Sequence, residues 1–276
     1  MKLTNMAAGA CIALVLVSGA YATGSKQKTQ PASGGTLTLE KGVLSVGMAI
    51  EYPPMEYYDA DGKTPMGFDV QLAKALADKL GLTVKYVDNA WEGIFAGVNK
   101  GDYDIIMSGV TITPERLQAH NFTKPYIGNA MTIVLLKGSG ITIDKPEDIA
   151  GRKVSYQAET TADIYATRLE KEQGVRFEAF EYDNIMQCFE DLKVGRVEVI
   201  VVDSLVAFDY VSGADSPFEI VWQGTADETF GICLKKGSDA LTAALDKALD
   251  ELFADGTIQK ISQDVFKQDL VSSVRK

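Results

Sequence analysis

Arg116 is the residue whose place in the sequence most needs a chemical explanation. It follows Thr113, a good helix-capping residue, and Pro114, which suits a first helical position, so it falls in the first turn of an expected helix. A cation there opposes the helix dipole by about 0.3–1 kcal/mol. Its guanidinium is a permanently charged fork that matches a carboxylate. The position favours an anionic ligand, and surface pairing with Glu115 or Asp104 is the alternative.

Small polar residues near Arg116, and at a second expected helix start, could assist it. Thr111 offers a hydroxyl, and Gly109 leaves the nearby backbone N–H groups uncovered. Thr160 and Thr161 begin an expected helix, where free N–H groups and the dipole favour an anion. The alternative for both threonines is simple capping.

Asp203 and two aromatic residues complete a possible site. Asp203 follows an apolar run, so its carboxylate needs a cationic partner, unless it only caps the next helix. Tyr52 and Trp91 offer flat apolar surfaces, although both could equally be core residues. A carboxylate clamp, an ammonium acceptor and aromatic walls together match an α-amino acid.

Catalytic, metal and cofactor chemistry find little support. His120 is the only histidine and falls in an expected polar helix, with no serine or cysteine partner indicated. The chain has no HExxH motif, no Cys/His metal spacing and no standard phosphate-binding glycine loop. The carboxylate pairs Asp59/Asp61 and Asp102/Asp104 are interpreted as solvated charge. We therefore expect no catalytic residue, no metal and no cofactor.

Strand and helix patterns alternate from Gly42 onward, which indicates an α/β protein. Glycines at 81, 101, 174 and 195 end four of the expected helices. The expected strands are 43–50, 82–87, 102–109, 152–157, 175–180 and 197–203. The expected helices are 67–81, 91–101, one opened by Thr113, 160–173, 184–194, 238–256 and 257–266.

The rhythm of these elements occurs twice, which predicts two Rossmann-like α/β lobes. The segments after Gly101 and Gly195 match closely, although any βαβ protein could show this similarity. Segments 123–140 and 221–238 predict a two-crossing hinge, so the first lobe is discontinuous. The expected limits are 39–129 with 228–276 for the first lobe, and 130–227 for the second. Ligands of open parallel sheets sit beyond the carboxyl ends of strands, so a cleft between the lobes is the expected site.

The N-terminus has the layout of an export signal. A positive start, an apolar run over 7–17 and Ala20-Tyr21-Ala22 predict a signal peptide, 1–22, cleaved after Ala22. An uncleaved anchor is the alternative, but the run is shorter than the roughly 20 residues that a span needs. Residues 23–38, rich in Gly, Ser and Thr, are expected to form a flexible tether.

Cys188 and Cys233 would remain after cleavage. Export permits a disulfide between them. Both lie among apolar residues, one in an expected helix and one in an expected strand, so two buried free thiols are the favoured interpretation.

The charge balance limits the partners. The 276-residue chain carries a formal net charge of −11, with 46% hydrophobic residues. An acidic surface argues against nucleic acid and anionic lipid as partners, and leaves open a small ligand in a locally positive cleft.

These residues resemble a known family, the type II periplasmic solute-binding proteins (family 3) that serve polar amino-acid ABC transporters. The resemblance covers about Gly42 to Phe266. It rests on the segments EYPPMEYYDADGKTPMGFDVQLAKALA, WEGIFAGVNKGDYDIIMSGVTITPERLQAHNFTKPY, QAETT and VVDS. The second segment is highly specific.

The resemblance implies which residues bind the α-carboxylate and the α-ammonium group that all amino acids share. Arg116 would clamp the α-carboxylate, assisted by Thr111 and the Gly109 backbone. Thr161 would donate to the same carboxylate from the second lobe. Asp203 would accept the α-ammonium group.

It also implies which residues surround the ligand's side chain. Ser108 would lie near Asp203, Tyr52 and Trp91 would form walls, and Gln157 would lie close to the side chain. One departure concerns selectivity. Many relatives carry an acid three residues before the tyrosine, and here Ala49 stands there. This slightly favours a neutral or polar side chain, although Glu51 could substitute for the missing acid.

The resemblance thus implies a periplasmic, monomeric binding protein. It would capture a free L-amino acid by hinge closure and deliver it to the membrane permease subunits of an ABC importer. Two other functions remain open. Some relatives are dehydratases, which would need a general acid in the cleft, with Glu56 as the candidate. A ligand-sensing module for a separate receptor is the third.

Overall fold

The structure, a computed structural model, describes residues 37–275. The predicted signal peptide and most of the predicted tether lie outside this range. The last two tether residues, Leu37 and Thr38, are described, and Thr38 is buried. Within 37–275, no helix combines the length and the apolar character that crossing a membrane requires.

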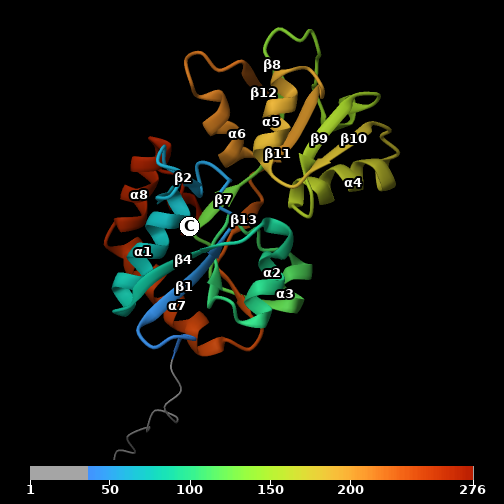
Figure 1. The fold of residues 1–276 in the computed structure, drawn as a ribbon. Coiled ribbons are helices and arrows are strands. Elements are labelled where there is room, and N and C mark those ends of the chain that lie inside the picture. The colour runs from blue at the N-terminus through green and yellow to red at the C-terminus, as the bar shows by residue number, and fades with distance from the viewer. Residues whose placement is uncertain (1–36, 276) are drawn as a thin grey trace, which may run out of the picture. The chain divides into compact units, whose positions relative to one another are not determined.

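The first lobe is built on a five-stranded sheet with the order β4-β1-β5-β14-β6. Figure 1 labels β1 and β4 of this sheet. β1 pairs in parallel with β4 and β5, whereas β14 runs antiparallel to β5 and β6. The strands are β1 (Val43–Met48), β4 (Thr83–Asp88), β5 (Ile105–Ile106), β6 (His120–Phe122) and β14 (Cys233–Lys235). The helices are α1 (Phe68–Leu80), α2 (Trp91–Lys100), α3 (Pro114–Ala119), α7 (Asp239–Ala254) and α8 (Thr257–Phe266).

The second lobe has its own five-stranded sheet, β10-β9-β11-β8-β12. β9 pairs in parallel with β10 and β11, and β8 is antiparallel to β11 and β12. The strands are β8 (Met131–Leu136), β9 (Lys153–Gln157), β10 (Glu178–Tyr182), β11 (Val199–Asp203) and β12 (Phe218–Gln223). The helices are α4 (Thr161–Gln173), α5 (Ile185–Lys193), α6 (Ser204–Val211) and the 3₁₀ turn η1 (Pro146–Ile149).

Two short strands connect the sheets. β7 (Ile127–Asn129) leads into β8, and β13 (Glu228–Phe230) leads back from β12 to β14. They pair with each other in antiparallel fashion, with Asn129 opposite Glu228. We propose that the lobe limits are those expected from the sequence, 39–129 with 228–276, and 130–227. The remaining elements are β2 (Tyr57–Tyr58), β3 (Pro65–Met66) and the 3₁₀ turn η2 (Ser272–Arg275).

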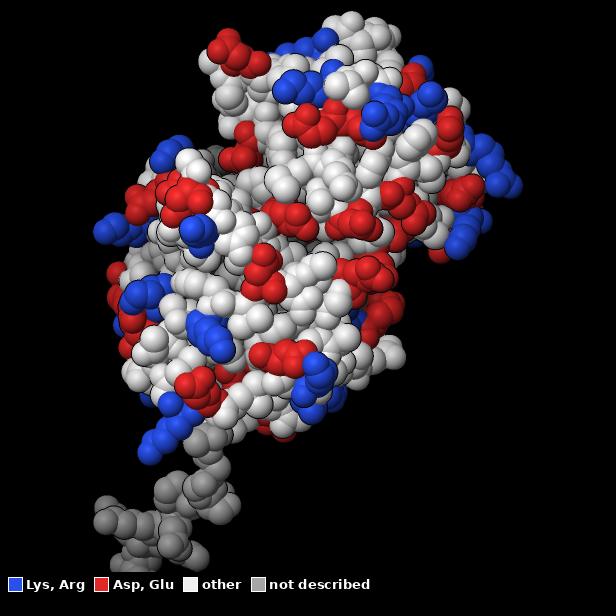
Figure 2. Space-filling model, viewed as in Figure 1, with Lys and Arg blue, Asp and Glu red and all other residues white. Residues whose placement is uncertain are grey.

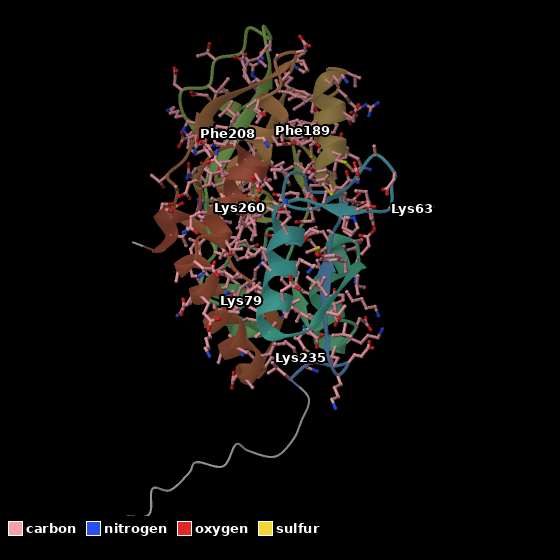
Figure 3. The ribbon with its side chains drawn as sticks, turned by 90° about the vertical axis from the view of Figure 1, so that its left-hand side faces the viewer. Lys63, Lys79, Phe189, Phe208, Lys235 and Lys260 are labelled. Carbon is pink, nitrogen blue, oxygen red and sulfur yellow. The ribbon has the colours of Figure 1, made fainter. Side chains whose placement is uncertain are left out.

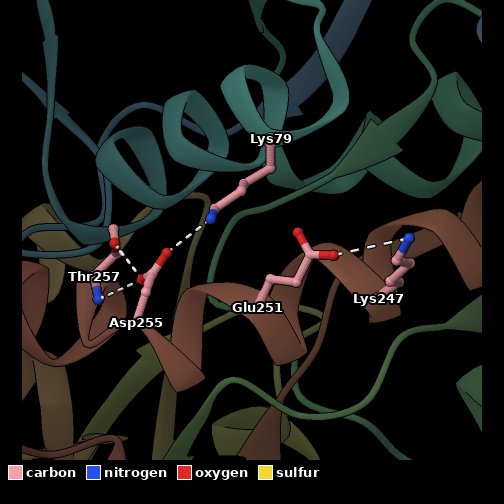
Figure 4. A network of polar contacts seen from close by, with 5 residues as sticks. All are labelled: Lys79, Lys247, Glu251, Asp255 and Thr257. Atoms are coloured by element: carbon pink, nitrogen blue, oxygen red, sulfur yellow. Dashed lines mark hydrogen bonds and ion pairs between the residues drawn. The ribbon is translucent and has the colours of Figure 1, made fainter.

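The returning helices α7 and α8 pack on α1, which explains their apolar faces. Leu72 and Leu76 of α1 and Leu245 of α7 are fully buried in one cluster. Burying each such side chain contributes about 1.5–3 kcal/mol. At the edge of this contact, Lys79 Nζ lies 2.7 Å from Asp255 Oδ2 (Figure 4). The C-terminal helices therefore belong to the core of the first lobe, as the sequence pattern indicated.

Local signals explain most helix boundaries. α1 ends at Gly81, whose φ of 68° is in the left-handed region that favours glycine. The Thr113 side chain caps α3 by accepting a hydrogen bond from Arg116 N–H at 3.2 Å. Thr160 caps α4 in the same way through Asp163 N–H. The Asp163 carboxylate accepts from Glu159 N–H and not from the N–H of the cap residue, so the two residues do not form a reciprocal capping box.

Three predictions about elements differ from the structure. β5 covers only Ile105–Ile106 of the expected 102–109, because the Asp104 side chain replaces ladder bonds by binding Ser45 N–H. β10 begins at Glu178 instead of 175, because Val175 N–H still bonds to Leu169 of the preceding helix. His120 is not helical: α3 ends at Ala119, and His120 pairs in β6.

The two cysteines are free and buried, as favoured by the sequence. Cys188 lies in α5 and Cys233 in β14, in separate core clusters. Burial raises the pKa of each thiol to about 12, which leaves both unreactive at neutral pH.

Candidate functional site

A pocket lined by residues of both lobes lies between them. The pocket is lined by the ten candidate site residues, together with Ala49 and Glu51, which the sequence analysis linked to selectivity. The ten are Tyr52, Trp91, Ser108, Gly109, Thr111, Arg116, Gln157, Thr160, Thr161 and Asp203.

The pocket lies where strands end, as expected for open α/β sheets. The segments after β1 and β5 line it from the first lobe. The last residue of β9, the segment that follows it and the last residue of β11 line it from the second. Trp91 opens α2, and Arg116 is in the first turn of α3. Lysines such as Lys63 and Lys235 are exposed away from the pocket, and Figure 3 labels them on the first lobe.

The guanidinium of Arg116 is held in place without an acidic partner. Nη1 donates to the carbonyl oxygen of Thr111 at 3.0 Å, and Cζ lies 5.4 Å from the Trp91 ring centroid and 5.1 Å from that of Phe95. Within residues 37–275 it forms no ion pair. Burial lowers the pKa of Arg116, but an arginine stays charged at neutral pH. The surface-pairing alternative is wrong, since Asp104 binds the Ser45 and Leu39 backbone.

Asp203 is the opposite case, a buried anion without a cation. The Tyr52 hydroxyl donates to Oδ2, and the Asn129 amide donates to Oδ1 at 2.6 Å. No described lysine, arginine or histidine forms an ion pair with it. Burial raises the pKa of Asp203, although these two hydrogen bonds and the charge of Arg116 oppose the shift. The capping alternative is wrong, because its side chain makes no cap bond to α6.

Polar contacts join the two lobes around the pocket. The Thr111 and Thr161 hydroxyl oxygens are 3.4 Å apart, and Trp91 Nε1 donates to the Glu159 carbonyl oxygen at 3.2 Å. Arg116 Nη2 reaches the same carbonyl at 3.5 Å. Glu159 has a φ of 59°, unusual for a residue other than glycine. In this conformation the carbonyl oxygen of Glu159 accepts hydrogen bonds from Trp91 and Arg116 of the first lobe.

The backbone of Gly109 does not have its expected role. Its N–H already donates to Asp69 Oδ2 at 2.9 Å, so it is not open to a ligand carboxylate. The glycine is needed for another reason. Its φ is 56°, and a Cβ there would lie 3.1 Å from the Tyr52 ring. Thr111, Thr161 and Arg116 therefore remain as the donors at this end.

The chain matches the sequence profile of the bacterial extracellular solute-binding proteins, family 3, over residues 44–268. The chain belongs to this family. It is 31% identical over 231 residues to the L-cystine-binding protein TcyJ of Escherichia coli (strain K12), covering 84% of this chain and 85% of that one.

Solved structures agree on a periplasmic binding protein fold. An ancestral arginine-binding protein bound to arginine superposes with a TM-score of 0.77 at 35% identity, covering 82% of this chain and 99% of the other. An ancestral amino acid-binding protein, AncCDT-1, a precursor of cyclohexadienyl dehydratase, gives 0.73 at 32% identity over 82% and 95%. This family 3 chain is thus an amino-acid-binding protein.

The pocket wall also holds the residues expected to set selectivity in this family 3 protein. The Gln157 amide is fixed by donating to the Asp183 carbonyl oxygen at 3.0 Å. Ala49 is buried, and Glu51 lies beside it at the pocket wall. Burial raises the pKa of Glu51, and the charges of Asp88 and Asp183 raise it further.

Two residues of the site were missed by sequence reasoning. Asn129 and Glu228 face each other on β7 and β13, and the Asn129 amide donates to Glu228 Oε2 at 2.9 Å as well as to Asp203. Burial, followed by the charge of Asp203, raises the pKa of Glu228 to about 7. No signal in the sequence identified Glu228, because 99 residues separate it from its partner Asn129.

The candidate acid for an enzyme does not reach the pocket. Glu56 is fully buried and does not line it, since Ser108 lies at the wall and donates to Glu56 Oε1 at 2.6 Å. Within residues 37–275, no three His, Cys, Asp or Glu residues are grouped as metal ligands.

Proposed function

We propose that this protein binds one free L-amino acid in the pocket and delivers it to the permease subunits of an ABC importer. It would do so outside the cytoplasmic membrane, as a monomer, after cleavage of residues 1–22. One observation carries the proposal: the pocket wall holds an unpaired cation, Arg116, and an unpaired anion, Asp203. A zwitterion neutralises both.

The contacts assign each end of the zwitterion. Its carboxylate would receive the Arg116 fork and the hydroxyls of Thr111 and Thr161, at the N-terminus of α4, where the helix dipole favours an anion. Its ammonium group would lie against Asp203, whose two hydrogen bonds keep the carboxylate oriented. Pairing the buried Asp203 and the half-buried Arg116 with opposite charges offsets a desolvation penalty that the ligand-free site retains.

A neutral or polar side chain suits the remaining wall. Ala49 gives that end no acid, while Trp91 and the fixed Gln157 amide provide an apolar face and a polar group. Glu51 is the alternative acid, and binding of a cationic amino acid would assign that role to it.

We propose binding without turnover. A dehydratase would need a proton donor at the substrate, and Glu56 is separated from the pocket by Ser108. Delivery to a receptor instead of a permease would use the same pocket, so the test below concerns the site itself.

Modified ligands test the two charged ends separately. The refolded protein is screened against the common amino acids by thermal shift, since a ligand at 100 times its Kd adds about 2.7 kcal/mol of stability. The best ligand is then compared with its α-carboxamide and its N-acetyl derivative by calorimetry. Each derivative should bind at least tenfold more weakly. Equal binding of either derivative, or turnover of a small cyclic acid, would contradict the proposal.

A further inference from the structure

Two carboxyl groups, those of Glu56 and Asp69, are buried against the pocket wall. Both residues are 0% exposed. Glu56 accepts from the Ser108 hydroxyl at 2.6 Å, and Asp69 Oδ2 accepts from Gly109 N–H at 2.9 Å. Together they hold two consecutive pocket residues, one by its side chain and the other by its backbone.

Each of these carboxyl groups has one oxygen without a donor. Glu56 Oε2 and Asp69 Oδ1 are both buried and accept no hydrogen bond within residues 37–275. The two residues lie on adjoining backbone, because Asp69 N–H donates to the Met55 carbonyl oxygen at 2.9 Å. Two buried, unsatisfied anionic oxygens are strongly unfavourable, whereas one proton makes the first carboxyl a donor and leaves the second an acceptor.

We infer that Glu56 and Asp69 share one proton between Glu56 Oε2 and Asp69 Oδ1, and that this acid pair fixes Ser108 and Gly109 in the pocket wall. Glu56 is the protonated partner. Asp69 Oδ2 accepts two hydrogen bonds, from Gly109 N–H and from the Tyr126 hydroxyl at 2.9 Å, and these stabilise its anion.

The electrostatic surroundings agree with a retained proton. Burial and the neighbouring Asp69 charge raise the pKa of Glu56, whereas the hydrogen bonds from Gly109 and Tyr126 oppose the effect of burial on the pKa of Asp69. The other titratable groups facing the pair are the hydroxyls of Tyr52 and Tyr126, which are neutral at these pH values. No described cation pairs with either carboxyl.

The inference predicts how stability depends on pH. Between the ordinary pKa values of the unfolded chain and the raised values of the folded chain, the folded state binds one more proton than the unfolded state. The pair therefore stabilises the fold at low pH, and this stabilisation is lost as pH rises. The folding equilibrium constant should decrease by up to tenfold per pH unit between about pH 5 and 7.

Single amide variants test the shared proton. In Glu56→Gln or Asp69→Asn, one NH₂ group faces one carboxylate, so the bond is kept without a titrating proton. Both variants should fold. Urea unfolding between pH 5 and 7 gives the slope of the logarithm of the folding equilibrium constant against pH, and this slope should be smaller in magnitude than in the wild type by up to one unit per pH unit. Asp78→Asn, on the exposed side of the same helix, should keep the wild-type slope. Wild-type slopes in both amide variants would overturn the inference, and Glu56→Gln alone decides if Asp69→Asn does not fold.

The stability of the double variant distinguishes a shared proton from the main alternative, in which both carboxylates are ionised. The amide oxygens would stay with Ser108 on one side and with Gly109 and Tyr126 on the other, so the two NH₂ groups would face each other. Glu56→Gln/Asp69→Asn should thus be less stable than the two single effects predict. If the carboxylates are both ionised and simply repel, the double variant would be the most stable of the three, which contradicts a shared proton.

The inference that the acid pair fixes Ser108 and Gly109 in the pocket wall rests on the proposed function, and it is tested separately by measuring ligand binding. At a pH where all variants are folded, Glu56→Gln should bind the amino acid nearly as well as the wild type, whereas the double variant should lose about tenfold or more in affinity. Unchanged affinity in the double variant would overturn this half. Absence of amino-acid binding in the wild type would refute the proposed function and leave the unfolding result intact.

Discussion

The two charged pocket residues, Arg116 and Asp203, are each held in place without an oppositely charged partner. Arg116 donates to a backbone carbonyl and stacks near Trp91 and Phe95, which orients the guanidinium without neutralising it. Asp203 is bound by two neutral donors, Tyr52 and Asn129, which orient it in the same sense. Neutral donors and rings hold a charge in place at little cost to its affinity for an opposite charge from outside.

The raised pKa of Glu228 predicts that amino-acid affinity depends on pH. Its pKa of about 7 should fall when a ligand ammonium group approaches Asp203, so the bound state holds fewer protons than the free state. Affinity should therefore rise as pH increases from 5.5 to 7.5, and Glu228→Gln should reduce this rise. Calorimetry in two buffers of different ionisation enthalpy counts the released protons. Equal proton release by the wild type and the variant would contradict the role of Glu228.

Eight of the ten pocket residues could be predicted from features with local meaning, such as the helix start at Thr113 or the pair Thr160–Thr161, whereas Ser108 and Gln157 were indicated only by the family resemblance. Asn129, Glu228 and the carbonyl oxygen of Glu159 could not, because their roles depend on contacts across β7, β13 and the two lobes. The Gly109 error has the same origin. The sequence shows that a glycine leaves the backbone open, but not that Asp69 occupies its N–H.

At the scale of elements, α3 is short, and its capping residue directly supports the site. Thr113 accepts from Arg116 N–H, so the residue that caps the helix also fixes the backbone of the clamp. Thr113→Ala should cost about 1 kcal/mol of stability and should weaken amino-acid binding as well. Unfolding by urea and calorimetry measure the two effects.

A matched cap in the second lobe provides the control. Asn184 caps α5 by accepting from Gln187 N–H at 3.1 Å, and it does not line the pocket. Asn184→Ala should cost similar stability and leave the affinity unchanged. If Thr113→Ala weakens binding no more than Asn184→Ala does, α3 is not a positioning element.

The sequence predicted best those helices that have regularly spaced apolar residues and a residue that marks their end. α1 has leucines at regular spacing and a left-handed glycine at its end, and its bounds agree closely with expectation. β5 and β10 differ because the Asp104 side chain and the Leu169 carbonyl oxygen accept hydrogen bonds in place of strand partners. Strand limits depend on partners, whereas helix limits are largely set within the helix.

At the scale of the whole described chain, three polar contacts between the lobes involve residues of the pocket or the residue next to one. Thr111 meets Thr161, Trp91 meets Glu159, and Tyr52 meets Asp203. A ligand that touches both lobes adds to these contacts and shifts the population toward the joined form. Acidic side chains predominate along the middle of the face shown in Figure 2, whereas the pocket wall includes the cationic Arg116.

The binding proposal requires that the Arg116 guanidinium holds the ligand carboxylate. Calorimetry with the amino acid identified by screening tests this most directly, using the wild type, Arg116→Ala, and Arg168→Ala as a control on the exposed side of α4. Arg116→Ala should fold and lose at least a hundredfold in affinity, about 2.7 kcal/mol, while Arg168→Ala binds as the wild type does. A folded Arg116→Ala protein with wild-type affinity would contradict the assignment of the site.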